Sequence, residues 1–153
     1  MTVDERLAQL GLSLPEAAKP LASYVPALQT GHFVYTSGQL PTRGGVLAYE
    51  GTIGLDLTED DGYEAAKIAC LNALAAIKTV IDDLDRVAHI VRVNGYVASA
   101  DGFTDQPTVV NGASDLLLEL FGHAGRHTRS AVGVYQLPLG APVEIDVIAE
   151  IRG

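Results

Sequence analysis

The most informative charged side chain in the sequence is Arg129. It lies in HTRSAVGVYQLP, residues 127–138, a segment whose β-branched residues predict a strand that stops at a proline. A guanidinium group is always charged, and its planar fork of donors matches a carboxylate. Arg129 is therefore either a solvated charge at a sheet edge or a clamp for a carboxylate, and the elements around it must decide between the two.

Hydrophobic periodicity predicts the helices that could position this residue. Residues 62–84 are rich in alanine and repeat apolar side chains at helical spacing. Residues 107–121 begin with a proline, which suits a first turn, and end before Gly122, which suits the position just past a helix. Residues 3–10 predict a shorter amphipathic helix.

Between and after these helices the pattern predicts strands. The expected strands cover residues 24–30, 32–36, 46–49, 89–98, 128–136 and 143–151. The order strands, helix, strand, helix, strands favours an α+β fold, with one mixed sheet and two helices packed on one of its faces.

The alternation within two strands predicts which side chains face the helices. In residues 89–98 we expect Val91 on the helix side and Ile90 on the opposite side. In residues 143–151 the odd-numbered apolar residues should face the helices, and Glu144 should point the other way. That second face mixes apolar and charged groups, which fits either a solvated face or a self-associating one.

Composition limits the class of protein. The 153 residues are 48% hydrophobic and 19% charged, which predicts one globular domain over residues 1–153. The formal net charge of -9 and the lack of a basic stripe argue against nucleic-acid binding. No apolar run or signal peptide predicts membrane contact, so we expect a cytoplasmic protein. Cys70 is expected to be a small buried hydrophobe. His123 and His127 are separated by a glycine, so no metal site is predicted.

Three segments taken together resemble the RidA/YjgF family of small imine deaminases. They are YVPALQTGHFVYTSGQLP, VNGASDLLLELFG and HTRSAVGVYQLPLGAPVEIDVIAEI. The likeness covers nearly the whole chain after about residue 20, leaving residues 1–20 as an N-terminal extension with a short helix. It is nearest to a less characterised YjgF-like branch of the family.

The resemblance implies a chorismate-mutase-like fold assembled as a homotrimer, with the sheets forming an inner barrel and ligand clefts between subunits. It implies a hydrolase that converts small 2-imino or 2-enamino acids, such as 2-iminopropionate and 2-aminoacrylate, to a 2-oxoacid and ammonia without a cofactor. The alternative is a non-catalytic trimeric protein that binds a small carboxylate metabolite in the same cleft. In either case the expected partners are that metabolite and further copies of the chain.

The resemblance also assigns residues to this site. Arg129 matches the carboxylate-binding arginine, and Glu144 the acidic residue beside the attacking water. The expected substrate-binding residues are Tyr24, Ser37, Gly38 and Asn111.

The chain departs from the family pattern beside Arg129. His127 and Thr128 stand where Pro-Ala is common, and Ala131 where a cysteine is common, and these differences change the shape of the expected pocket.

Spacing adds a test of this assignment. If the last two strands formed a hairpin, Arg129 would lie near Glu150, and Glu144 would be about 20 Å further along at ~3.3 Å per residue. Either these strands are not hairpin partners, or Arg129 and Glu144 meet from different subunits, with Glu150 as the fallback partner.

Overall fold

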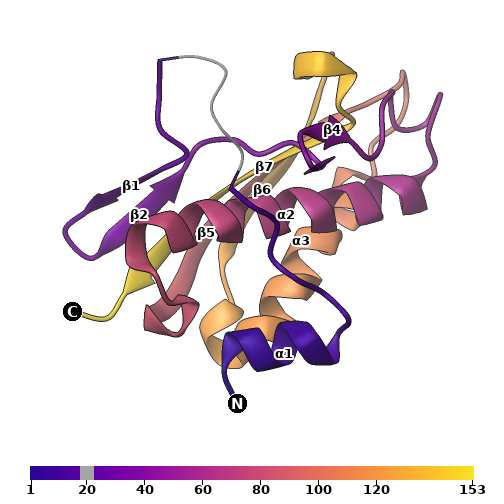
Figure 1. The fold of residues 1–153 in the computed structure, drawn as a ribbon. Coiled ribbons are helices and arrows are strands. Elements are labelled where there is room, and N and C mark those ends of the chain that lie inside the picture. The colour runs from indigo at the N-terminus through magenta and orange to yellow at the C-terminus, as the bar shows by residue number, and fades with distance from the viewer. Residues whose placement is uncertain (18–22) are drawn as a thin grey trace.

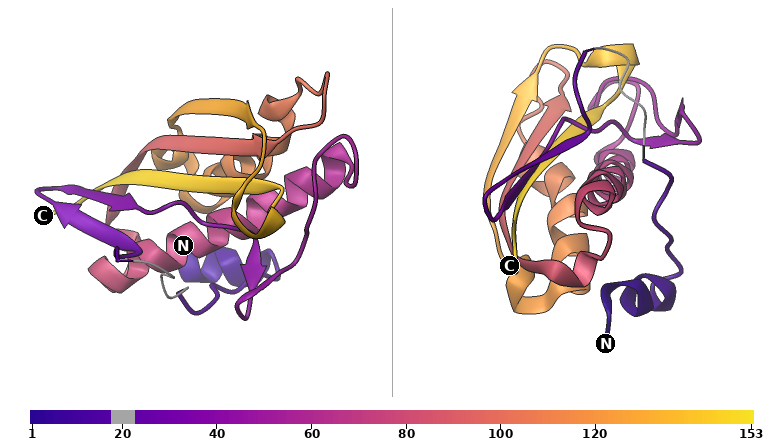
Figure 2. Two further views of the ribbon diagram at one scale, coloured as in Figure 1. Left: turned by 90° about the horizontal axis from the view of Figure 1, so that it is seen from above. Right: turned by 60° about the vertical axis from the view of Figure 1, so that its left-hand side comes forward.

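The computed structural model describes residues 1–17 and 23–153, so residues 18–20 of the expected N-terminal extension lie outside the described residues. A five-stranded mixed sheet carries two long helices on one face (Figures 1 and 2), which confirms the predicted α+β architecture. The sheet has the order β1-β2-β7-β5-β6, made of β1 (Ala27–Thr30), β2 (Phe33–Thr36), β7 (Val143–Ile151), β5 (Val87–Ala98) and β6 (Thr128–Val134). The remaining elements are α1 (Val3–Gln9), β3 (Thr42–Arg43), β4 (Val46–Leu47), α2 (Glu59–Ile81), η1 (Leu84–Arg86), α3 (Gln106–Phe121), η2 (Gly122–Gly125) and η3 (Pro138–Gly140).

The two long helices begin and end where the local chemistry requires. Thr58 caps α2 through a reciprocal capping box with Asp61, which satisfies two backbone donors of the first turn. Pro107 lies in the first turn of α3, and Gly122 ends that helix with a positive φ of 59°. Among residues 1–17 and 23–153, no helix combines the length and apolarity needed to cross a bilayer.

The contact between α2 and α3 is unusually close. Gly112 of α3 lies against the backbone of Tyr63, and a Cβ added at Gly112 would stand 2.9 Å from the Tyr63 carbonyl carbon. Next to this contact the Tyr63 hydroxyl donates to the Asp115 carboxylate at 2.8 Å. That bond, together with burial, raises the pKa of Tyr63 to about 12. Because Gly112 has no side chain, α3 can approach the backbone of α2 this closely.

A bulge in β5 changes which of its residues face the helices. The register between β5 and β7 shifts between Ile90 and Arg92. Ile90 is fully buried together with Val93 and Val97, whereas Val91 is only partly buried. The prediction that Val91 faces the helices and Ile90 faces away was wrong, because one extra residue reverses the alternation upstream of it. In β7 the alternation is unbroken, and all its odd-numbered residues are buried as predicted.

Strands β6 and β7 are not hairpin partners, because β5 lies between them. β5 pairs antiparallel with β7 and parallel with β6. Arg129 is therefore opposite Val93, and Glu150 is opposite Phe33 and His89. This removes Glu150 as the strand partner of Arg129.

The N-terminal helix α1 lies against the end of α3 (Figure 1), and Val3 and Leu7 are buried in the core. Arg6 Nη1 donates to the backbone oxygens of Glu119 and Leu120 at 3.4 and 3.3 Å. The last carbonyls of a helix have no partner within it and attract positive charge, so Arg6 satisfies the C-terminus of α3.

The α2–α3 contact yields a stability prediction. In an exposed helix Gly→Ala is stabilising by about 1 kcal/mol. Gly112→Ala should instead destabilise the protein by about 1–3 kcal/mol, because the new methyl group forces two helix backbones apart. Urea unfolding would measure this change.

Glu119→Ala, on the exposed face of the same helix, is the matched control and should change the free energy of unfolding by less than about 0.5 kcal/mol. Equal or greater stability of Gly112→Ala would contradict the proposed close contact.

Candidate functional site

Arg129 projects from the edge strand β6 toward the helix side of the sheet. Its neighbour on β5 is Val93, which is fully buried, and paired residues of neighbouring strands point to the same face. Arg129 Nη1 donates to Asn111 Oδ1 at 2.7 Å and to Ser114 Oγ at 3.1 Å. Both acceptors lie on α3, three residues apart, and therefore share one face of the helix.

The guanidinium of Arg129 keeps unused donors. Its two protein acceptors are neutral, and within the part of the chain that the structure describes no carboxylate pairs with it. Among the described residues, none accepts a hydrogen bond from Nε or Nη2 of Arg129. Those two atoms form the edge of arginine that grips a carboxylate with two parallel bonds. Arg129 is therefore a half-buried cation held by neutral groups, with a free edge that has the geometry to bind a carboxylate.

Ser114 and His127 extend this group, and neither was among the site residues expected from the sequence. His127 Nε2 lies 2.8 Å from Ser114 Oγ, and His127 Nδ1 lies 2.6 Å from the Gly125 carbonyl oxygen. Burial lowers the pKa of His127, and the positive charge of Arg129 lowers it further, while the hydrogen bond to Gly125 opposes this shift. A serine on the buried face of a helix was the available sequence signal, but its partner is 13 residues away and across a loop.

Glu144 lies on the opposite face of the sheet. It alternates with the buried Val143 and Ile145 and pairs with Tyr96 of β5. Burial and then the charge of Asp146 raise the pKa of Glu144. The half-buried carboxyl group therefore holds its proton to a higher pH than an ordinary glutamate.

Gly38 lies directly against Glu144. A Cβ at Gly38 would stand 2.5 Å from Glu144 Oε2 and 2.7 Å from its carboxyl carbon. Only a residue without a side chain leaves room for the carboxyl group in this position. Gly38 and Glu144 are therefore in direct contact, whereas the sequence indicated each of them separately.

The other two residues expected here are placed differently from one another. Ser37 follows β2, and both of its hydrogen-bond donors are used. Its backbone N–H donates to the Pro26 carbonyl oxygen at 2.8 Å, and its hydroxyl donates to the Val25 carbonyl oxygen at 2.6 Å. Tyr24 precedes β1 rather than lying within a strand, and it is 53% exposed. Its side chain is free to contact a ligand or another chain.

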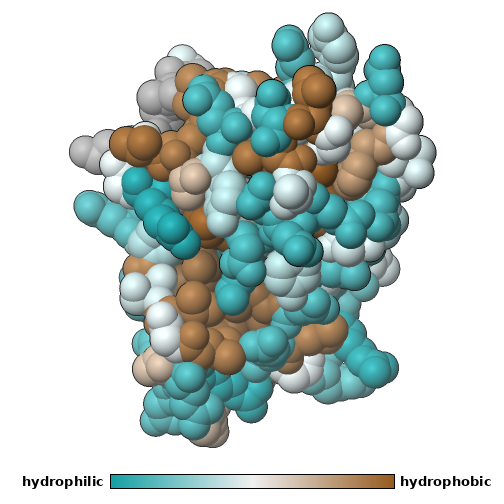
Figure 3. All heavy atoms as spheres, turned by 90° about the vertical axis from the view of Figure 1, so that its right-hand side faces the viewer, coloured by the Kyte–Doolittle hydropathy of each residue, from teal (hydrophilic) through white to brown (hydrophobic). Residues whose placement is uncertain are grey.

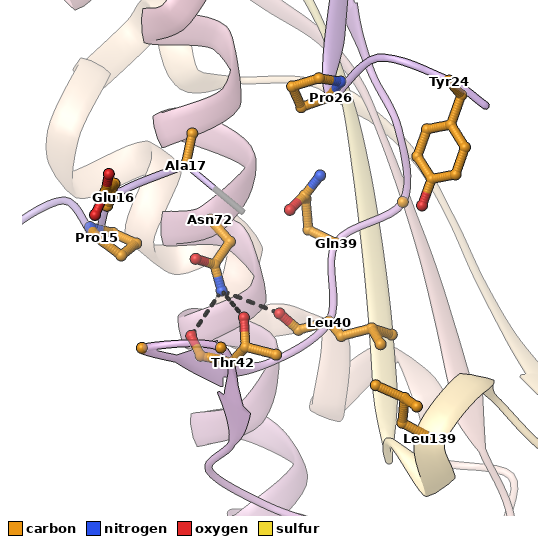
Figure 4. A pocket seen from close by; sticks show the side chains of 13 residues that line it. Pro15, Glu16, Ala17, Tyr24, Pro26, Gln39, Leu40, Thr42, Asn72 and Leu139 are labelled. Atoms are coloured by element: carbon orange, nitrogen blue, oxygen red, sulfur yellow. Dashed lines mark hydrogen bonds between the residues drawn. The ribbon is translucent and has the colours of Figure 1, made fainter. Parts of the chain in front are cut away.

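A pocket of about 500 Å³ opens beside this turn (Figure 4). Its lining includes Tyr24, Gly38, Gln39, Leu139 and Asn72. Figure 4 shows Tyr24 and Asn72 on opposite sides of it. Arg129, Asn111 and Glu144 are not part of its lining.

Asn72 was also missed from the sequence. It is 2% exposed on α2, and its Nδ2 donates to the backbone oxygens of Leu40 and Thr42 at 3.0 and 2.9 Å. It therefore fixes the turn that carries Gly38. A lone amide within an alanine-rich helix was the signal for it.

Within one chain the candidate residues form two separate groups. Arg129 and Asn111 lie together at the β6 edge on the helix side, and Gly38 and Glu144 lie together on the opposite face. Along β5, Arg129 is level with Val93 and Glu144 with Tyr96, three residues further on. The sheet itself separates the two groups, so one small molecule cannot touch both in the same chain.

Other reactive groups offer less. Cys70 is fully buried, which raises the pKa of its thiol to about 12 and leaves it unreactive. Among the described residues, no three His, Cys, Asp or Glu side chains are placed to share a metal ion.

Comparison with known proteins agrees with the fold. "Protein TCP17" of Trypanosoma cruzi is 43% identical over 98% of this chain and 94% of its own length. A crystal structure of a protein of unknown function from Agrobacterium tumefaciens is 41% identical, with a TM-score of 0.92 over 98% of this chain and 92% of that one. A more distant relative is the 2-iminobutanoate/2-iminopropanoate deaminase of Dermatophagoides farinae, 28% identical over 92% of this chain and 95% of its own.

The sequence model of one family, described as "YjgF/chorismate_mutase-like, putative endoribonuclease", matches residues 4–151. That range takes in every helix and strand except the first residue of α1. The chain therefore belongs to the YjgF/chorismate mutase-like family, as the sequence resemblance predicted.

Proposed function

We propose that this protein is a homotrimeric deaminase of small 2-imino and 2-enamino acids. The observation that carries the proposal is Arg129, a half-buried cation held by Asn111 and Ser114 with its Nε–Nη2 edge unused by the described residues. The deaminase among the relatives supports the reaction class. The net charge of -9 does not favour the ribonuclease activity that the family description mentions.

In the proposed reaction Arg129 binds the substrate carboxylate and thereby fixes the adjacent imine carbon. A water oxygen adds to that carbon, and a proton passes to the nitrogen. The carbon–nitrogen bond then breaks, which leaves a 2-oxoacid and ammonia. Atoms balance with one water consumed and no oxidant or cofactor.

Glu144 is proposed to hold the water and carry the proton. A carboxyl group with a raised pKa exchanges protons more readily near neutral pH than an ordinary glutamate. Tyr24, the carbonyl oxygen of Ser37 and the backbone of Gly38 in the neighbouring turn would complete this half of the site.

Because the sheet separates Arg129 from Glu144, the complete site needs two chains. A head-to-tail ring, such as the proposed trimer, brings the Arg129 edge of one subunit to the Glu144 face of the next. Exposed apolar side chains are available for such contacts: Leu28, Phe33, Tyr35, Val132 and Tyr135. Apolar patches are also visible between polar groups on the side of the molecule drawn in Figure 3.

The first test removes the clamp. Arg129→Ala should lower kcat/KM for freshly generated 2-iminopropionate by about 100-fold, because two charge-assisted bonds to the carboxylate are lost. Arg129→Lys should be intermediate, since it retains the charge without the fork. Release of ammonia and 2-oxoacid would measure the rates.

A folded wild-type trimer that gives no acceleration would overturn the deaminase proposal. Saturable binding of a 2-oxoacid that Arg129→Ala abolishes would then identify a carboxylate-binding protein.

The second test uses the pKa of Glu144. Folding raises this pKa, so Glu144 ionises at a lower pH in the unfolded chain than in the folded one. The free energy of unfolding of the wild type therefore decreases as the pH rises from the unfolded pKa through the folded pKa. Glu144→Gln should therefore be about as stable as wild type near pH 4 and increasingly more stable toward pH 8, while losing activity. Urea unfolding at constant protein concentration would measure this trend.

Glu64→Gln, an exposed position on α2, is the control and should show no such trend. A pH-independent difference for Glu144→Gln would contradict the raised pKa.

The third test asks whether two chains share a site. Co-expressed Arg129→Ala and Glu144→Gln chains should recover about one quarter of wild-type activity, because random mixing gives that share of interfaces an intact Arg129 and an intact Glu144. Each variant alone should retain only a small fraction of wild-type activity, about one hundredth for Arg129→Ala. If all catalytic groups came from one chain, the mixed assemblies would recover nothing.

A further inference from the structure

A hydrogen-bonded chain leads from a loop carbonyl to the guanidinium of Arg129. The Gly125 carbonyl oxygen lies 2.6 Å from His127 Nδ1. His127 Nε2 lies 2.8 Å from Ser114 Oγ, and Ser114 Oγ lies 3.1 Å from Arg129 Nη1. Ser114 is 8% exposed and His127 is half-buried, so both lie largely out of solvent.

The direction of each proton in this chain follows from its two ends. The Gly125 carbonyl can only accept, so His127 carries its proton on Nδ1. Arginine can only donate, so Ser114 Oγ accepts from Arg129. The Ser114 hydroxyl proton is then directed to the unprotonated Nε2 of neutral His127. Each of the three groups therefore has one defined orientation.

Neutral His127 suits the charges around it. Arg129 on β6 and His89 on β5 both oppose a positive charge on His127. Arg126, which precedes it, and Glu150 of β7 line the same surface hollow as His127 and His89. Protonation of Nε2 would direct a second cationic donor at the oxygen that already accepts from Arg129.

We propose that His127, acting through the Ser114 hydroxyl, is a positioning residue that holds the Arg129 guanidinium with its Nε–Nη2 edge directed to a carboxylate ligand. This deepens the proposed function and rests on Arg129 being the carboxylate clamp. Asn111 and Ser114 occupy Nη1, so the ligand is received side-on at the opposite edge. His127 itself does not touch the ligand.

The test compares two substitutions of His127. In His127→Asn the amide still donates to Gly125 but offers Ser114 no acceptor. In His127→Gln the longer amide places an acceptor near the position of Nε2. The dissociation constant for pyruvate, a simple 2-oxoacid probe, should rise about 3- to 10-fold in His127→Asn and return toward wild type in His127→Gln. Ligand-detected NMR titration would measure it.

A double-mutant cycle separates positioning from folding. Ser114→Ala should weaken pyruvate binding as much as His127→Asn, and the double variant should be no weaker than either single variant. In deaminase assays these variants should raise KM and leave kcat nearly unchanged. In wild type, pyruvate affinity should fall as pH decreases through the lowered pKa of His127, and His127→Gln should lack that pH dependence.

The results distinguish failure of the Arg129 clamp from failure of the positioning role of His127. If Arg129→Ala binds pyruvate as well as wild type, the clamp itself is wrong. If Arg129→Ala loses binding while His127→Asn matches wild type, only the positioning role is overturned. Additive losses in the double variant, or unchanged pyruvate affinity at acidic pH, would also overturn it.

Discussion

The parallel pairing of β5 with β6 is the constraint on which the rest of the structure depends. Parallel strands cannot be joined by a tight turn, so the chain must cross from the end of β5 back to the start of β6. Helix α3 makes that crossing and packs on one face of the sheet, antiparallel to the strands it connects. The same connection that closes the sheet therefore places Asn111 and Ser114 beside Arg129 at the outer edge.

This topology also explains why the candidate residues of one chain form two separate groups. Arg129 shares a face with the helices, whereas Glu144 faces away from them on β7. Each side chain is held by its own neighbours. Two neutral acceptors hold the guanidinium of Arg129, and the carboxyl group of Glu144 packs against Gly38. In the proposed trimer, assembly would join two prepared surfaces without reorganising either one. Such preparation lowers the entropy lost when ligand and subunits come together.

Much of the fold followed from sequence because its signals are local. Helical spacing, Pro107 and Gly122 predicted α3 nearly to its ends, and the period of two predicted both faces of β7. The bulge between Ile90 and Arg92 was missed, since an extra residue leaves no mark in an apolar run. The placement of β5 between β6 and β7 was left open, because strand pairing is set by the whole sheet.

The candidate site divides in the same way. The sequence pointed to Arg129 and Asn111, which the structure joins at 2.7 Å. It did not indicate Ser114 or His127, because their bond joins a helix to a loop and exists only after folding. Nor could it show that Asn72 supports the turn bearing Gly38 from a different element.

The contact between Gly38 and Glu144 has a consequence for how the sequence can change. The space that a side chain at position 38 would fill is already taken by the carboxyl group of residue 144. A larger residue at 38 becomes acceptable only in a chain whose residue 144 is shorter or turned elsewhere. A side chain at position 38 would therefore displace the carboxyl group of Glu144 from its present place, even where the rest of β7 is unchanged.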